Sequence, residues 1–117
     1  MAKEASIVDL FAGPGGLGEG FSSFRARGKS PFRISVSIEK EASAHKTLQL
    51  RSFFRQFSGT VPSEYYQYLK GQISRSELFE AFPGEAAIAV EETLGGPRAL
   101  GDAEDDRYIY KLSLIHI

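Results

Sequence analysis

The chain has 117 residues, of which 42% are hydrophobic and 25% charged, and its formal net charge is −1. These values are typical of one soluble globular domain and exclude a disordered chain. No apolar run approaches the roughly 18 residues of a membrane span, and the start lacks the apolar stretch of a secretory signal, so we expect a cytoplasmic protein. Because there is no cysteine, disulfides, thiolate metal sites and a cysteine nucleophile are excluded, and the two histidines lie too far apart to suggest a metal site.

Charge is unevenly distributed along the chain. Between Arg25 and Arg75, ten basic residues stand against three acids, whereas between Ser76 and Arg107 nine acids stand against two basic residues. A basic first half suits contact with phosphate, but these charges neither cluster nor alternate with aromatic residues. We therefore interpret them as solvated helix faces, and the charge alone does not predict DNA binding.

The first half of the chain alternates strand and helix signals. The apolar run Ala5–Phe11 stops at a glycine cluster, which predicts a buried strand ending in a tight turn. A helix is expected from about Leu17 to Arg27, a second strand over Ile34–Ile38, and a strong amphipathic helix over Glu41–Phe57. This order of strand, glycine turn, helix, strand and helix predicts the start of a parallel α/β sheet.

The second half indicates short helices instead of the next strand. Glu64–Leu69 predicts a short aromatic helix or turn, and Ser74 with Glu77 has the spacing of a capping box that opens another helix. Glu85–Leu94 predicts a further helix, which ends at a Gly-Gly-Pro sequence. These segments fit inserted helices.

The remaining residues are less regular. Leu100–Arg107 predicts an acidic loop. Tyr108–Ile117 alternates apolar and other residues, which favours a strand, although its abrupt apolar end also suggests that residues 112–117 are a non-native tail.

The most informative segment is the glycine cluster that follows the first strand. Glycines let the backbone turn sharply and approach a ligand without a Cβ in the way, and the following helix directs free N–H groups at the same point. The spacing Gly13-x-Gly15-x-x-Gly18 also satisfies the dinucleotide fingerprint, but that pattern is weak by itself.

Two residues argue against a dinucleotide. Asp9 places a carboxylate where a pyrophosphate would lie, and Pro14 removes a backbone N–H that would otherwise contact phosphate. S-adenosylmethionine carries no phosphate, and its sulfonium and ammonium groups are cationic, so a nearby carboxylate favours it.

Glu39 supplies a second candidate group. It ends the second strand roughly 20 residues after the glycines, where an acid can accept hydrogen bonds from both ribose hydroxyls. The alternative is that Glu39 is an ordinary acid at a helix N-terminus. Phe11, at the exit of the first strand, is either a core residue or an aromatic surface for adenine.

The segment Asp-Leu-Phe-Ala-Gly-x-Gly-Gly followed by Gly-Phe, from Asp9 to Phe21, resembles the first motif of the DNA (cytosine-5) methyltransferases. The segment Ser37-Ile38-Glu39-Lys40 resembles the second motif of that family, where an acid binds the cofactor ribose. Lys40 departs from the aromatic residue often found beside that acid. The resemblance covers roughly Ile7 to Phe57.

This resemblance implies an α/β, partial Rossmann-like fold of S-adenosylmethionine-dependent methyltransferases. Residues 1–58 would bind the cofactor, residues 59–107 would be inserted helices and an acidic loop, and residues 108–117 a strand or tail. We expect Asp9 to orient the glycine loop from behind through backbone N–H groups. The implied cofactor-binding residues are Phe11, Ala12, Gly13, Pro14, Gly15, Gly16, Glu39 and Lys40.

The resemblance also implies methyl transfer to carbon 5 of cytosine in duplex DNA, as in restriction–modification. Members of the family flip the target base out of the helix and attack it with a cysteine thiolate from a Pro-Cys motif. This chain has neither cysteine nor a later motif, so no catalytic residue can be named. We therefore expect an amino-terminal piece that is inactive alone and, with few strands, marginally stable.

Two alternatives remain open at this point. One is a Rossmann domain of an oxidoreductase that binds a nicotinamide or flavin dinucleotide. The other is a non-enzymatic regulator or partner subunit that keeps the glycine loop for structural reasons.

Overall fold

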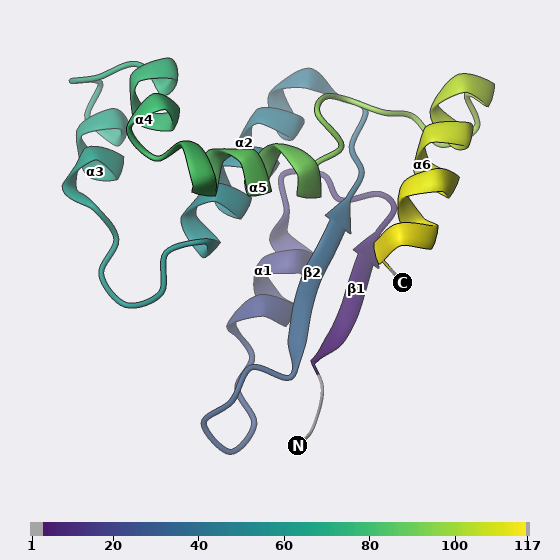
Figure 1. The fold of residues 1–117 in the computed structure, drawn as a ribbon, viewed down its shortest axis with the longest axis horizontal. Coiled ribbons are helices and arrows are strands. Elements are labelled where there is room, and N and C mark those ends of the chain that lie inside the picture. Colours follow the sequence, from purple (N-terminus) through teal and green to yellow (C-terminus); the bar gives the residue numbers. More distant parts are fainter. Residues whose placement is uncertain (1–3, 117) are drawn as a thin grey trace.

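The computed structural model describes residues 4–116, with side chains described up to Lys111. This part of the chain is a mixed α/β structure of two strands and six helices (Figure 1). The elements are β1 (Ala5–Asp9), α1 (Gly16–Ser23), β2 (Phe32–Ser37), α2 (Ala42–Arg55), α3 (Ser63–Leu69), α4 (Arg75–Ala81), α5 (Pro83–Glu92) and α6 (Ala103–His116).

The two strands form a parallel sheet joined by α1, which is the expected strand–helix–strand unit. Ile7 pairs with Ile34 and Val8 with Val36, so Ser35 is an extra residue that bulges from β2. Because side chains alternate along a strand, the bulge changes which face the following residues occupy. Ile34 faces α1 through Gly18, whereas Val36 belongs to the core beside α6.

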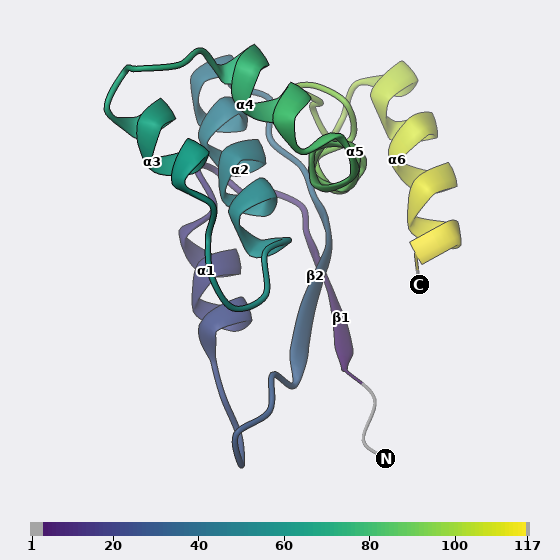
Figure 2. The ribbon, with the colours of Figure 1, turned by 60° about the vertical axis from the view of Figure 1, so that its left-hand side comes forward.

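Helices cover both faces of this small sheet. Figure 2 shows α1 and α6 on opposite sides of the two strands. The core on the α6 side contains Val36, Ile38, Leu94 and Ile109, each at most 7% exposed, with Val8 packed against them. This core therefore surrounds the end of β2, and Glu39 comes directly after the buried Ile38.

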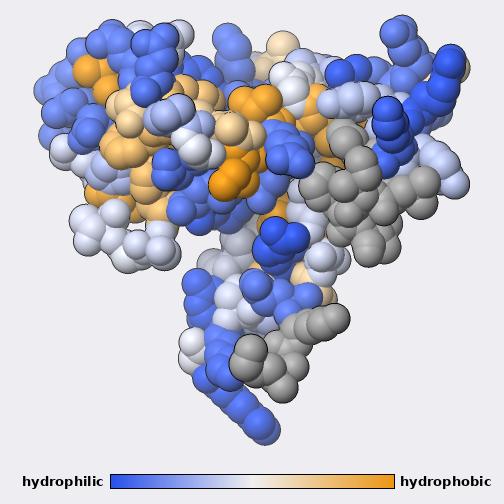
Figure 3. Space-filling view, in the orientation of Figure 1, coloured by the Kyte–Doolittle hydropathy of each residue, from blue (hydrophilic) through white to orange (hydrophobic). Residues whose placement is uncertain are grey.

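The helices α2, α3, α4 and α5 form a second core beside the sheet (Figure 1). Phe53 is fully buried at its centre and stacks on Phe79 with ring centroids 4.7 Å apart. Figure 3 shows that hydrophobic patches interrupt the hydrophilic surface over this part. The other fully or nearly buried members of this core are Leu78, Ala86 and Ala89.

Most predicted elements are confirmed, with shifted ends. β1 ends at Asp9, so Leu10 and Phe11 belong to the bend and not to the strand. The expected helix to Arg27 ends at Ser23, because Phe24 has an extended backbone. The capping box is confirmed: the Ser74 hydroxyl accepts the Glu77 N–H, and the Glu77 carboxylate accepts the Ser74 N–H.

The prediction of a strand over residues 108–117 is wrong, because this segment belongs to α6. Asp102 caps the helix by accepting the N–H groups of Glu104 and Asp105, and acids in the first turn favour the positive end of the helix dipole. Ile109 is buried, whereas Tyr108 is 38% exposed. The predicted acidic loop therefore ends at Asp102, and the expectation for Ile117 lies outside the described residues.

Candidate functional site

The glycine bend, residues 10–16, lies against the end of β2. The N–H of Ala12 donates to the carbonyl of Ile38 at 2.9 Å, and the N–H of Gly15 donates to the carbonyl of Ala12 at 3.1 Å. Gly13 and Gly15 have φ values of 58° and 99°, which L side chains rarely adopt. The sequence therefore needs glycine at these two positions to turn the chain from β1 into α1.

Glu39 faces this bend. Its Oε1 accepts the N–H of Gly13 at 3.0 Å, and its Oε2 accepts the N–H of Glu41 at 2.8 Å. Each carboxylate oxygen has a further lone pair, so the group retains acceptor capacity for a ligand. Residues of the first and second predicted motifs thus form one corner at the ends of both strands.

Two acids, Glu39 and Glu41, lie at the N-terminus of α2. Glu41 is the N-cap of α2, where its carboxylate accepts the N–H groups of Ser43 and Ala44. The hydrogen bonds from Ala44 and then Ser43 hold the pKa of Glu41 below its ordinary value. Glu41 therefore caps the helix, and the carboxylate of Glu39 joins the start of α2 to the bend.

The predicted site residues differ in exposure. Phe11 is 81% exposed, so its ring is a surface residue and not part of the core. Pro14, Gly16 and Lys40 are also exposed, and Ala12 is buried. Phe11 is therefore free to contact a ligand at the bend.

The glycines of the bend have different surroundings. A Cβ at Gly13 or Gly16 would meet nothing within 4 Å, whereas a Cβ at Gly15 would lie 3.1 Å from Cδ1 of Leu48 and 3.5 Å from Cδ of Arg51. Gly15 thus permits the close approach of the bend to α2. Gly13 and Gly16 leave open space on the outer side.

Asp9 is the last residue of β1, at the end of the strand where it was expected. Its main-chain carbonyl accepts the N–H of Ile38 at 2.8 Å, which continues the strand pairing. Within the described residues, its carboxylate makes no hydrogen bond to the bend, and Glu39 makes that bond instead. The hydrogen bond of a carboxylate to the bend thus comes from Glu39, and the orienting role of Asp9 stays a prediction.

The loop after α5 is a third segment that lies beside Glu39, and the sequence did not indicate this contact. The N–H of Arg98 donates to the carbonyl of Glu39 at 2.9 Å, which brings the loop after α5 to the corner. His45 is buried, and its Nε2 lies 2.8 Å from the carbonyl of Thr93, so α2 holds the start of the same loop. The Gly-Gly-Pro sequence indicated only the end of a helix.

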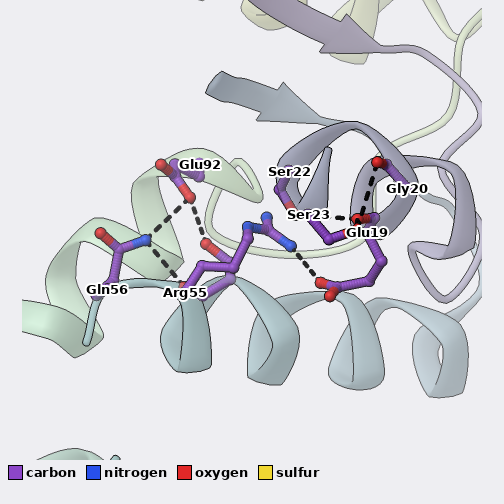
Figure 4. A network of polar contacts seen from close by, with 8 residues as sticks. Glu19, Gly20, Ser22, Ser23, Arg55, Gln56 and Glu92 are labelled. Atoms are coloured by element: carbon purple, nitrogen blue, oxygen red, sulfur yellow. Dashed lines mark hydrogen bonds and ion pairs between the residues drawn. The ribbon is translucent and has the colours of Figure 1, made fainter. Parts of the chain in front are cut away.

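A separate cavity of about 700 Å³ lies between α1, β2, α2 and α5, and none of the predicted site residues lines it. Figure 4 shows its polar network, where Arg55 and Glu19 join α2 to α1 through an ion pair of 2.7 Å. Glu92 accepts hydrogen bonds from Ser52 and Gln56. Burial raises the pKa of Glu92, although the Ser52 hydrogen bond and the charge of Arg55 oppose this shift.

The described residues contain no group of three or more His, Cys, Asp or Glu side chains that could hold a metal ion. Across residues 4–116, the helices are too short or too polar for any of them to cross a membrane.

Sequence comparison relates the chain to a methyltransferase. It is 33% identical over 85 residues to the type II methyltransferase M.Bpa9945I of Bacillus paralicheniformis, and the match covers 66% of this chain and 18% of that protein. The chain therefore spans less than a fifth of the length of this relative. No protein-family model and no solved structure matches the chain.

Proposed function

We propose that the chain is the amino-terminal part of an S-adenosylmethionine-dependent DNA (cytosine-5) methyltransferase and that it binds the methyl donor at the glycine bend. The observation that carries this proposal is the carboxylate of Glu39, which turns toward the bend and accepts the N–H of Gly13 at 3.0 Å. The methyltransferase relative supports the general class.

The residues of this corner fit an adenosyl group with a cationic end. The remaining lone pairs of Glu39 suit the two ribose hydroxyls, and the exposed ring of Phe11 suits the face of adenine. The open side of Gly13 and Gly16 admits the ligand close to the backbone. Asp9, at the end of β1, adds negative charge, which favours a cationic ligand over a diphosphate.

The chemistry of methyl transfer needs residues beyond this chain. Bound S-adenosylmethionine supplies an activated methyl group, but the cytosine-5 family activates its target with a cysteine, and this sequence has none. We therefore propose that the chain binds the cofactor without methylating DNA, and that duplex DNA and a role in restriction–modification belong to the longer enzyme.

Calorimetric titration separates this proposal from a dinucleotide-binding domain. We expect S-adenosylmethionine and its demethylated product, S-adenosylhomocysteine, to bind, and NAD not to bind at the same concentrations. Binding of NAD without binding of S-adenosylmethionine would reject the proposal and favour the oxidoreductase alternative. Binding of neither would favour a non-enzymatic role for the bend.

A further inference from the structure

Glu39 is held from three directions. Its two carboxylate oxygens accept the N–H groups of Gly13 and Glu41, and its main-chain carbonyl accepts the N–H of Arg98 at 2.9 Å. The first two bonds join neighbouring parts of the corner. The third comes from the loop after α5, so the position of Glu39 depends on where that loop lies.

The loop itself starts in a conformation that needs support. Leu94 has a φ of 61° and is 1% exposed, and Gly95 follows with a φ of 75°. A non-glycine residue in the left-handed region is strained, so surrounding contacts must hold it. Burial of Leu94 against Ile38 and Ile109 anchors the start of the loop but leaves its continuation to other contacts.

Asp105 anchors that continuation. Its Oδ1 accepts a hydrogen bond from Nη1 of Arg98 at 3.1 Å, and its Oδ2 accepts a hydrogen bond from the N–H of Ala99 at 3.0 Å. The Arg98 guanidinium also lies over the ring of Tyr108 at 4.1 Å. One carboxylate on α6 therefore fixes both the side chain of Arg98 and the peptide that follows it.

We propose that Asp105 is a positioning residue for the cofactor site, which acts on Glu39 through the main chain of Arg98. The path runs from the Asp105 carboxylate to Arg98 and Ala99, and from the Arg98 N–H to the carbonyl of Glu39. The consequence for S-adenosylmethionine rests on the proposed function. The consequence for the geometry of the corner does not, because it concerns hydrogen bonds within the chain.

The first test measures the corner without ligand. Amide hydrogen exchange of the full chain reports the opening of each hydrogen bond. We expect Asp105→Ala to speed exchange about tenfold or more at Arg98, and severalfold at Gly13 and Glu41. Asp106→Ala is the matched control, because Asp106 lies on the same turn of α6 and accepts the N–H of Gly101 at 2.9 Å without contacting Arg98. The proposal would be overturned if Asp105→Ala left exchange at the amides of Gly13, Glu41 and Arg98 unchanged. It would also be overturned if exchange there were equally fast in both variants.

The second test measures binding of S-adenosylmethionine by calorimetry in a double-mutant cycle. We expect Asp105→Ala to weaken binding about three- to tenfold and Asp106→Ala less than twofold. If Asp105 acts through Glu39, adding Asp105→Ala to Glu39→Ala gives little further loss, since coupled residues are not additive. Equal losses in both backgrounds would show a general structural role and overturn the proposal.

The two tests also distinguish the ways in which the inference can fail. If the wild-type chain does not bind S-adenosylmethionine but exchange responds to Asp105→Ala as expected, the proposed function fails and the anchoring of Glu39 by Asp105 stands. If the wild-type chain binds, Glu39→Ala weakens binding and Asp105→Ala does not, the role of Asp105 fails and the proposed function stands.

Discussion

The carboxylate of Glu39 accepts the backbone N–H of Gly13 at 3.0 Å, although 26 residues separate them in sequence. The parallel pairing of β1 and β2 makes this contact possible, because it brings the carboxyl ends of both strands to one edge of the sheet. The contact joins the glycine bend and the acid that follows β2 into one site.

Removing the Glu39 carboxylate is expected to weaken binding of S-adenosylmethionine by about 2 kcal/mol or more, which is roughly thirtyfold, because hydrogen bonds to a charged acceptor are lost. Glu39→Ala tests this by calorimetry. Glu39→Gln should not restore binding fully, since its amide has one acceptor oxygen for the N–H groups of Gly13 and Glu41. Glu80→Ala, an exposed acid on α4, is the control and should bind normally. Unchanged affinity in Glu39→Ala would contradict the proposed site.

Gly15→Ala is expected to destabilise the fold by about 1–3 kcal/mol, because the residue has a φ of 99° and its new Cβ would lie 3.1 Å from Leu48. Urea unfolding measures this change. Gly16→Ala is the matched control, since its Cβ meets nothing within 4 Å and its φ is not in the left-handed region. If both variants unfold at the same urea concentration, Gly15 does not have the packing role assigned to it.

Phe11→Ala is expected to change the free energy of unfolding by less than about 0.5 kcal/mol, because the side chain is 81% exposed. The same variant should lower affinity for S-adenosylmethionine by about 0.5–1.5 kcal/mol if its ring stacks on adenine. Thermal unfolding and calorimetry measure the two effects.

Phe53→Ala provides the opposite comparison, since this ring is fully buried and its loss should cost about 3–5 kcal/mol of stability. A large loss of stability in Phe11→Ala, with affinity unchanged, would show that Phe11 is structural.

Glu92 makes the stability depend on pH. Burial raises its pKa above the ordinary value of 4.5, so the folded chain binds more protons than the unfolded chain between the two values. As the pH rises from about 4.5 to the pKa of Glu92 in the folded chain, ionisation of Glu92 therefore lowers the free energy of unfolding. Glu92→Gln, which cannot ionise, should gain stability relative to the wild type over this window and then keep a constant difference.

Urea unfolding of the wild type and of Glu92→Gln across pH 4–8 measures that difference in the free energy of unfolding. The other acids are present in both proteins, so their contribution cancels in the difference. Glu80→Gln, at an exposed position on α4, is the control for the Glu→Gln change itself. A Glu92→Gln difference that falls as pH rises would contradict the assigned direction of the pKa shift.

The features predicted well from the sequence are local ones. Each of three such features has its cause within a few residues: the apolar run that stops at glycines, the capping box of Ser74 and Glu77, and the amphipathic helix over Glu41–Phe57. The pairing of Glu39 with the glycine bend followed from the parallel order of the two strands. The fold beyond these two strands stays a prediction.

The features missed depend on contacts between distant residues. Alternation from Tyr108 onward predicted a strand, but the Asp102 cap and the burial of Ile109 select a helix. Nothing near Arg98 in sequence indicates that its N–H reaches Glu39, or that Asp105 holds it. The hydrogen bond from Glu39 to the bend likewise depends on the pairing of the strands, because Glu39 lies 26 positions after Gly13 in the sequence.

The most direct test of the central claim is an NMR titration of the ¹⁵N-labelled chain with S-adenosylmethionine. We predict saturable shifts of the amide signals of Gly13, Gly16 and Glu41, with Phe11 ring signals shifting in parallel, and no comparable change in Glu39→Ala. Shifts confined to the cavity around Arg55 and Glu92, or no shift at the glycine bend at saturating ligand, would contradict the account.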